Sequence, residues 1–141
     1  MTRILKKIRD DDGTAIAELA AMIDFRNEPK QILISLSGVI LGEQTFELKD
    51  YLQNLSFFPA DRWVLDLGDL DVISQRGLFS LVKMSSVLKG RGQILEISNI
   101  NLGLRATLQQ LNLEKFFIFT KEPTRIDDVE IPFDMEAISL N

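Results

Sequence analysis

The feature that most constrains the fold is the run from Trp63 to Leu81, WVLDLGDLDVISQRGLFSL. Its first five residues place apolar side chains at alternate positions, which predicts a central β-strand. After a short polar loop, the tetrapeptide Ser74-Gln75-Arg76-Gly77 leads into an amphipathic pattern that predicts a helix from about Gln75 to Lys89. Backbone N–H groups lack partners at a helix start, where the helix dipole favours negative charge. We therefore expect function at this strand-to-helix junction.

Alternating strands and helices are predicted along most of the chain. From residue 22 short apolar–polar alternations indicate strands, and amphipathic segments between them indicate helices. Short connections favour an α/β sheet with parallel crossovers and a hairpin at one edge. The expected strands cover residues 22–27, 32–38, 63–67, 93–100 and 115–120, and the expected helices cover about 43–55, 75–89 and 104–111.

The chain of 141 residues fits one domain with a segment on either side. Residues 1–21 are interpreted as an N-terminal extension, in which ILKKI and AIAELAAMI favour helical turns. Residues 22–120 form the expected domain. Residues 121–141 form an acidic C-terminal tail whose interspersed apolar residues suit docking on the domain.

Composition narrows the possible chemistry. The chain has no Cys, which excludes a thiol nucleophile or thiolate metal site, and no His, the side chain most used in acid–base catalysis. An enzyme that uses carboxylates, Lys or Ser is the alternative, but we expect no catalytic residues, no metal, no cofactor and no enzymatic activity. Asp66, Asp69 and Asp71 are interpreted as residues with structural roles in turns rather than as metal ligands.

Charge and hydropathy indicate the partners and the location. The net charge of −5 argues against a nucleic-acid partner. The one basic cluster is followed by three aspartates and is interpreted as a solvated, frayed terminus. No apolar run reaches the length of a membrane span, and no secretory h-region is present, so a cytoplasmic protein is expected. The cluster consists of Arg3, Lys6, Lys7 and Arg9.

Four landmarks of residues 22–120 resemble the STAS domain, the fold of bacterial anti-sigma factor antagonists. They are the VLDL strand, Gly77 opening a helix after a polar loop, the KGRGQILEI segment, and the LRATLQQLNLEKFF helix and strand. The resemblance implies a mixed sheet of four to five strands with helices mainly on one face. It also implies a non-enzymatic interaction module that binds a partner-switch kinase, which acts as an anti-sigma factor. STAS domains also serve as regulatory subunits of membrane transport complexes, which is the alternative.

The family's regulatory loop is altered in this chain. In the family, a serine in an Asp-Ser-Ser/Thr-Gly loop is phosphorylated, which abolishes partner binding. The loop aligns onto Ser74-Gln75-Arg76-Gly77, so Ser74 stands at the acidic position and Gln75 at the phosphoacceptor. A second acidic position of the family falls on Leu41. Because an amide cannot accept a phosphoryl group, the resemblance implies a module without the usual serine switch.

The expected partner-binding residues lie on the loop and the first turns of the helix. They are Ser74, Gln75, Arg76, Gly77 and Phe79. Phe79 is the expected anchor, because aromatic side chains are favoured at interface hot spots, and Arg76 calls for an acidic patch on the partner. Ser74 has two interpretations: a helix cap through its hydroxyl, which is favoured, or a displaced phosphoacceptor.

Overall fold

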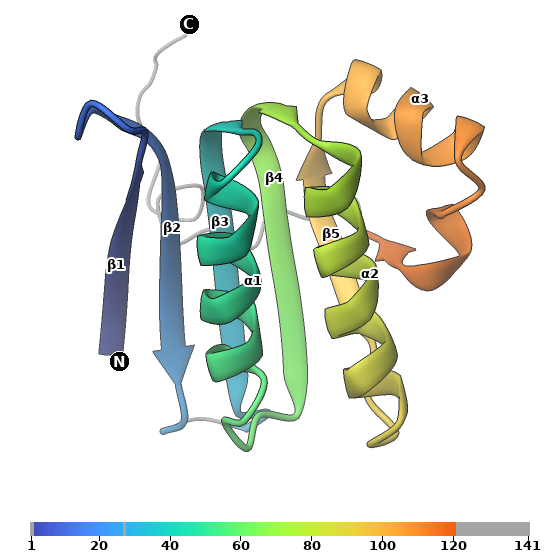
Figure 1. Cartoon of the computed structure of the whole chain (residues 1–141). Coiled ribbons are helices and arrows are strands. Elements are labelled where there is room, and N and C mark those ends of the chain that lie inside the picture. The colour runs from blue at the N-terminus through green and yellow to red at the C-terminus, as the bar shows by residue number, and fades with distance from the viewer. Residues whose placement is uncertain (1, 27, 121–141) are drawn as a thin grey trace, which may run out of the picture.

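The computed structural model describes residues 2–26 and 28–120, which form a six-stranded mixed sheet in the order β1-β2-β3-β4-β5-β6 (Figure 1). β1, β2 and β3 pair antiparallel, whereas β3 to β6 pair parallel. The acidic tail of residues 121–141 lies outside the described residues. The strands are β1 (Thr2–Arg9), β2 (Ala15–Asp24), β3 (Gln31–Ile40), β4 (Arg62–Ile73), β5 (Leu95–Ile100) and β6 (Ile118–Phe119).

Two of the helices run side by side over one face of the sheet (Figure 1). These are α1 (Gln44–Leu55), which connects β3 to β4, and α2 (Gln75–Lys89), which connects β4 to β5. The shorter α3 (Leu102–Gln110) lies beyond the β5 side of the sheet and leads through a 3₁₀ turn (Glu114–Phe116) to β6. The predicted mixed α/β sheet with helices mainly on one face is confirmed, with six strands in place of four to five.

The helical interpretation of the first 19 residues is wrong. This segment forms β1 and β2, which pair over their whole length with one irregularity between Ile8 and Arg9. The alternate residues Ala17, Leu19 and Ala21 of β2 are buried in the core. The helix propensity of alanine and leucine is a weak preference that tertiary packing overrides. The basic cluster accordingly lies on an ordered strand and not on a frayed end.

The expected boundary between an extension and the domain falls inside β2, which runs from Ala15 to Asp24. β4 is also longer than the predicted strand of residues 63–67. It continues to Ile73, so Asp66, Asp69 and Asp71 lie in a strand rather than in a turn. The polar loop before α2 is therefore only one residue long.

The core lies between the sheet and the α1–α2 layer. Trp63, near the start of β4, is fully buried, and its indole N–H donates a 3.1 Å hydrogen bond to the Gln93 side-chain oxygen. On α2 the residues Leu78, Leu81 and Leu88 are buried. Met84 is only 4% exposed. The buried arc of α2 extends to Met84 because α1 packs along this helix.

Gly38 fixes the path of β3 beside β2. Its φ of +88° lies in the left-handed region, and a Cβ atom there would stand 2.2 Å from the carbonyl oxygen of Ile16. Gly13 has a similar φ of +83°, but a Cβ atom there would meet nothing within 4 Å. Substitutions at the two glycines therefore distinguish the free-energy cost of a left-handed backbone from the free-energy cost of a steric clash.

Gly38→Ala is expected to lower the free energy of unfolding by about 3 kcal/mol or more, because it adds a backbone clash to the strain of a left-handed alanine, itself about 1–2 kcal/mol. Gly13→Ala, the matched control, is expected to cost only that strain. Urea unfolding followed by circular dichroism measures both. Equal losses for the two variants would show that the close approach of Gly38 to β2 is not a constraint.

Candidate functional site

The connections β3–α1 and β4–α2 meet at one edge of the sheet. Because β3 and β4 are parallel, their carboxyl ends lie at the same edge, and both helices start there (Figure 1). Two hydrogen bonds join the connections. The backbone N–H of Ser74 donates to the carbonyl oxygen of Ile40 at 2.8 Å, and the hydroxyls of Ser74 and Thr45 lie 3.0 Å apart. The starts of α1 and α2 are thus held as one unit.

Ser74 is the N-cap of α2. It has an extended backbone, with φ −68° and ψ 159°, and its hydroxyl oxygen accepts a 3.0 Å hydrogen bond from the backbone N–H of Gly77. This satisfies one of the free N–H groups at the helix start. The capping role predicted for Ser74 is therefore confirmed.

Gly77 is required by packing rather than by its backbone angles. A Cβ atom at this position would stand 2.7 Å from the Cγ1 atom of Ile73, the last residue of β4. Any larger residue would push the first turn of α2 away from the end of the strand. Gly77 therefore lets the helix start close to the sheet, and it is buried beneath the exposed pair Gln75 and Arg76.

Arg76 stands at an electrostatically unfavourable place. It is exposed in the first turn of α2, which has no acidic residue, and a cation near a helix N-terminus costs about 0.3–1 kcal/mol. Its guanidinium carbon lies 5.8 Å from the ring centre of Phe46 on α1, within the range of a cation–π contact. No ion pair involves Arg76 among residues 2–26 and 28–120.

Exposed apolar side chains lie on both helices near their starts and on the connection before α1. Phe79 on α2 is 49% exposed, and Phe46 on α1 is 54% exposed. Leu41, which stands at the family's second acidic position, lies in the β3–α1 connection and is 44% exposed. We call the five residues Leu41, Phe46, Gln75, Arg76 and Phe79 the helix-start surface.

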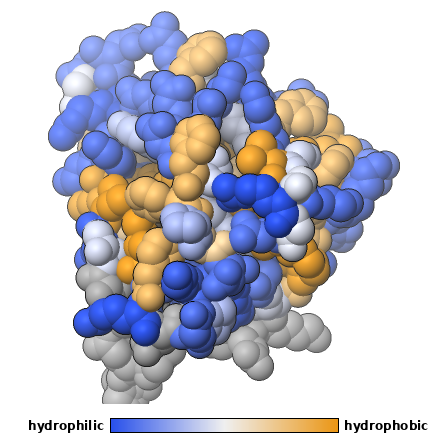
Figure 2. All heavy atoms as spheres, turned by 90° about the horizontal axis from the view of Figure 1, so that it is seen from below, coloured by the Kyte–Doolittle hydropathy of each residue, from blue (hydrophilic) through white to orange (hydrophobic). Residues whose placement is uncertain are grey.

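Phe46 and Thr45 were not predicted from the sequence. Both act across the two connections, and their contacts with Arg76 and Ser74 join residues about 30 positions apart. The one signal in the sequence was that Phe46, an aromatic residue, stands among the polar positions of the helix pattern before Leu48. At the opposite end of the molecule, where α1 and α2 finish, Figure 2 shows hydrophilic atoms around scattered hydrophobic groups. Phe57, which is 73% exposed, follows α1 there.

The aspartates of β4 do not form a metal site. Asp66 is buried, and one of its carboxylate oxygens accepts a 3.0 Å hydrogen bond from the backbone N–H of Gly68. Asp69 and Asp71 are exposed. Within the described residues no three acidic side chains are grouped so as to hold a metal ion. None of the helices in this part of the chain has the length and apolar character needed to cross a membrane.

Comparisons with known proteins agree with this fold. A family model described as "Mlab, STAS domain" matches residues 23–120. An anti-sigma factor antagonist from Mycobacterium paratuberculosis superposes with a TM-score of 0.59 at 16% identity, covering 78% of this chain and 89% of that one. SpoIIAA, an anti-sigma factor antagonist, matches in its unphosphorylated form with a TM-score of 0.58 at 13% identity, covering 72% and 89%.

The phosphorylated form of the Bacillus cell fate determinant SpoIIAA also matches, with a TM-score of 0.55 at 14% identity, covering 77% of this chain and 98% of that one. At these identities the structural matches establish the fold alone. Comparison with curated proteins gives no match.

Ser74→Ala is expected to lower the free energy of unfolding by about 1 kcal/mol, because the N–H of Gly77 loses its acceptor. Ser74→Asp is expected to keep most of that stability, since aspartate is an equally good N-cap. Ser86→Ala, a change at an exposed serine within the same helix, is the control and is expected to stay within about 0.5 kcal/mol of the unmodified chain. Thermal or urea unfolding measures all three. No loss in Ser74→Ala would contradict the capping role.

Proposed function

The chain belongs to the STAS domain family, and on that basis we propose that it is a non-enzymatic module that binds an anti-sigma factor of the serine-kinase type through its helix-start surface. The observation that carries the proposal is the β4–α2 junction. Ser74 and Gly77 keep the cap and the close packing of the helix start, while Gln75 and Arg76 project from it. The junction thus presents exposed side chains on a rigid support.

The position of Arg76 favours a partner with an acidic surface. Its charge is opposed by the dipole of α2, and no carboxylate of the first turn compensates it. A carboxylate on the partner would relieve that repulsion and would also gain a charge-assisted hydrogen bond. Phe46 in contact with the cation and Phe79 three residues after it on α2 offer exposed apolar area, which suits the combination of aromatic and arginine anchors common at interface hot spots.

The side chains at the loop support a surface of fixed charge. Phosphorylation acts by adding nearly two negative charges and three acceptor oxygens. Gln75 has no hydroxyl group to receive them. The hydroxyl of Ser74 already accepts from Gly77 and contacts Thr45, so a phosphoryl group there would have to displace the Thr45 contact. We therefore propose that the usual serine switch is absent.

Arg76→Glu is expected to weaken binding to the anti-sigma factor by roughly tenfold or more, because it replaces an attraction with a repulsion. Phe79→Ala is expected to weaken binding by about fivefold or more, the loss typical of an aromatic anchor. Isothermal titration against each kinase-type anti-sigma factor of the same genome measures the effect.

Phe57→Ala is the matched control, because this phenylalanine is exposed at the opposite end of α1. It is expected to leave the affinity unchanged. Equal affinities of Arg76→Glu, Phe79→Ala and the unmodified chain would place the interface elsewhere. Binding to a membrane-transporter subunit, with no affinity for any anti-sigma factor, would overturn the proposal in favour of the transport alternative.

Incubation with the bound kinase and ATP is expected to leave the β4–α2 junction without phosphate. Gln75→Ser restores a hydroxyl at the exposed first position of α2 and is expected to gain phosphate there and to lose partner affinity. Intact mass and peptide mapping by mass spectrometry measure both. Phosphate on Ser74 of the unmodified chain, absent in Ser74→Ala, would contradict the proposed lack of a switch.

A further inference from the structure

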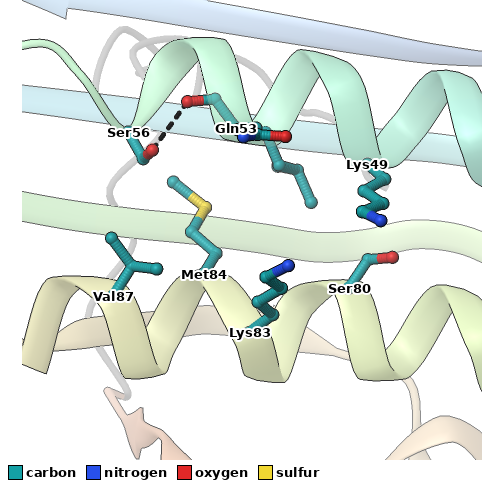
Figure 3. A pocket seen from close by; sticks show the side chains of 8 residues that line it. Lys49, Gln53, Ser56, Ser80, Lys83, Met84 and Val87 are labelled. Carbon is teal, nitrogen blue, oxygen red and sulfur yellow. Dashed lines mark hydrogen bonds between the residues drawn. The ribbon is translucent and has the colours of Figure 1, made fainter.

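A shallow pocket of about 80 Å³ opens between α1 and α2, farther along both helices than Phe46 and Arg76. Figure 3 shows side chains of the two helices pointing into this groove from both sides. Leu52, Met84 and Val87 provide its apolar lining. Lys49 from α1 and Lys83 from α2 both project into the groove (Figure 3).

The size of the pocket limits what enters it. A dry engineered cavity of about 150 Å³ holds one benzene molecule. At about 80 Å³, this pocket has roughly half that volume. It suits the end of one aliphatic side chain and is too small for a ring cofactor or a long acyl chain. An occupant therefore places a small apolar group here while the rest of it lies outside.

The basic side chains around the pocket favour an occupant with acidic groups. Lys49 and Lys83 are the only charged residues that line it, both are exposed, and neither forms an ion pair within the described part of the chain. α2 as a whole carries three basic residues and no acidic one, in a chain whose net charge is −5. Two unpaired cations that line one apolar pocket favour an occupant that brings carboxylates to them.

We propose that the groove between α1 and α2 receives an acidic segment of the partner protein, in which an aliphatic side chain flanked by carboxylates enters the pocket. The aliphatic side chain contacts Met84 and Val87, and the carboxylates pair with Lys49 and Lys83. The groove continues the helix-start surface along the two helices, so this inference rests on the proposed function and defines the chemistry of the partner.

The test uses the ¹⁵N-labelled full chain and three blocked peptides of defined sequence, followed by two-dimensional NMR. Glu-Asp-Leu-Asp-Glu carries both elements, Glu-Asp-Asn-Asp-Glu lacks the aliphatic side chain, and Lys-Lys-Leu-Lys-Lys reverses the charge. The first peptide is expected to shift the amide signals of Ser80, Lys83, Met84 and Val87 in a saturable manner. The other two are expected to bind at least about fivefold more weakly.

Two double variants, each of which replaces two lysines with glutamates, provide a matched comparison. The double variant Lys49→Glu/Lys83→Glu is expected to weaken binding of the first peptide by roughly tenfold, since two exposed ion pairs become repulsions. The double variant Lys7→Glu/Lys30→Glu makes the same change of net charge at exposed sites outside the groove and is expected to bind as the unmodified chain does. Unchanged spectra elsewhere establish that both variants remain folded.

Three results would overturn the proposal: no saturable shifts with the first peptide, equal shifts with all three peptides, or equal losses in the two double variants. Shifts of the same signals by phosphatidylglycerol vesicles, with none from the peptides, would assign the groove to a membrane surface instead. If Arg76→Glu abolishes anti-sigma binding while the groove variants change neither measurement, the groove proposal fails and the proposed function stands. If the peptide binds as expected but no anti-sigma factor does, the proposed function fails and the groove proposal stands.

Discussion

The parallel pairing of β3 with β4 is the interaction on which the rest of the structure depends. It brings two strand ends to one edge of the sheet, and each strand end leads into a helix on the same face. The Ser74 N–H to Ile40 C=O hydrogen bond then extends the pairing of the two strands into the connections that follow them. Helix starts from separate parts of the sequence thereby become neighbours, and the contact of Phe46 with Arg76 is a direct consequence.

The central unit was predictable from the sequence because its signals are local. The strand at Trp63 has alternating apolar residues, and the serine cap, glycine and amphipathic pattern that follow mark the start and face of α2 within a few positions. The N-terminal hairpin was not predictable in the same way. AIAELAAMI consists of good helix formers, and it becomes a strand because β1 and β3 pair with it on both sides and because Leu19 and Ala21 are buried.

The residues of the candidate site also fall into two groups, those with a local sequence signal and those without one. Ser74, Gln75 and Gly77 were assigned from their order in the chain, and the structure gives Ser74 and Gly77 physical roles at the helix start. Phe46 and the Lys49–Lys83 pair were not found, since each becomes meaningful only when α1 lies beside α2. Met84 is a similar case, because the neighbouring helix covers it and makes it part of the pocket.

The α1–α2 layer carries cations without ion-pair partners among the described residues. Arg76 opposes the dipole of its own helix, which reduces the stability of the isolated chain by a small amount, and Lys49 and Lys83 line one groove without an ion pair. A ligand that binds only the folded state adds stability through mass action, and an acidic partner would also compensate the charge of Arg76. If the proposed function holds, the lack of a hydroxyl at Gln75 would keep the charge of this surface constant. Occupancy of the surface would then follow the concentrations of chain and partner, and regulation would act on those concentrations or on the partner rather than on the loop.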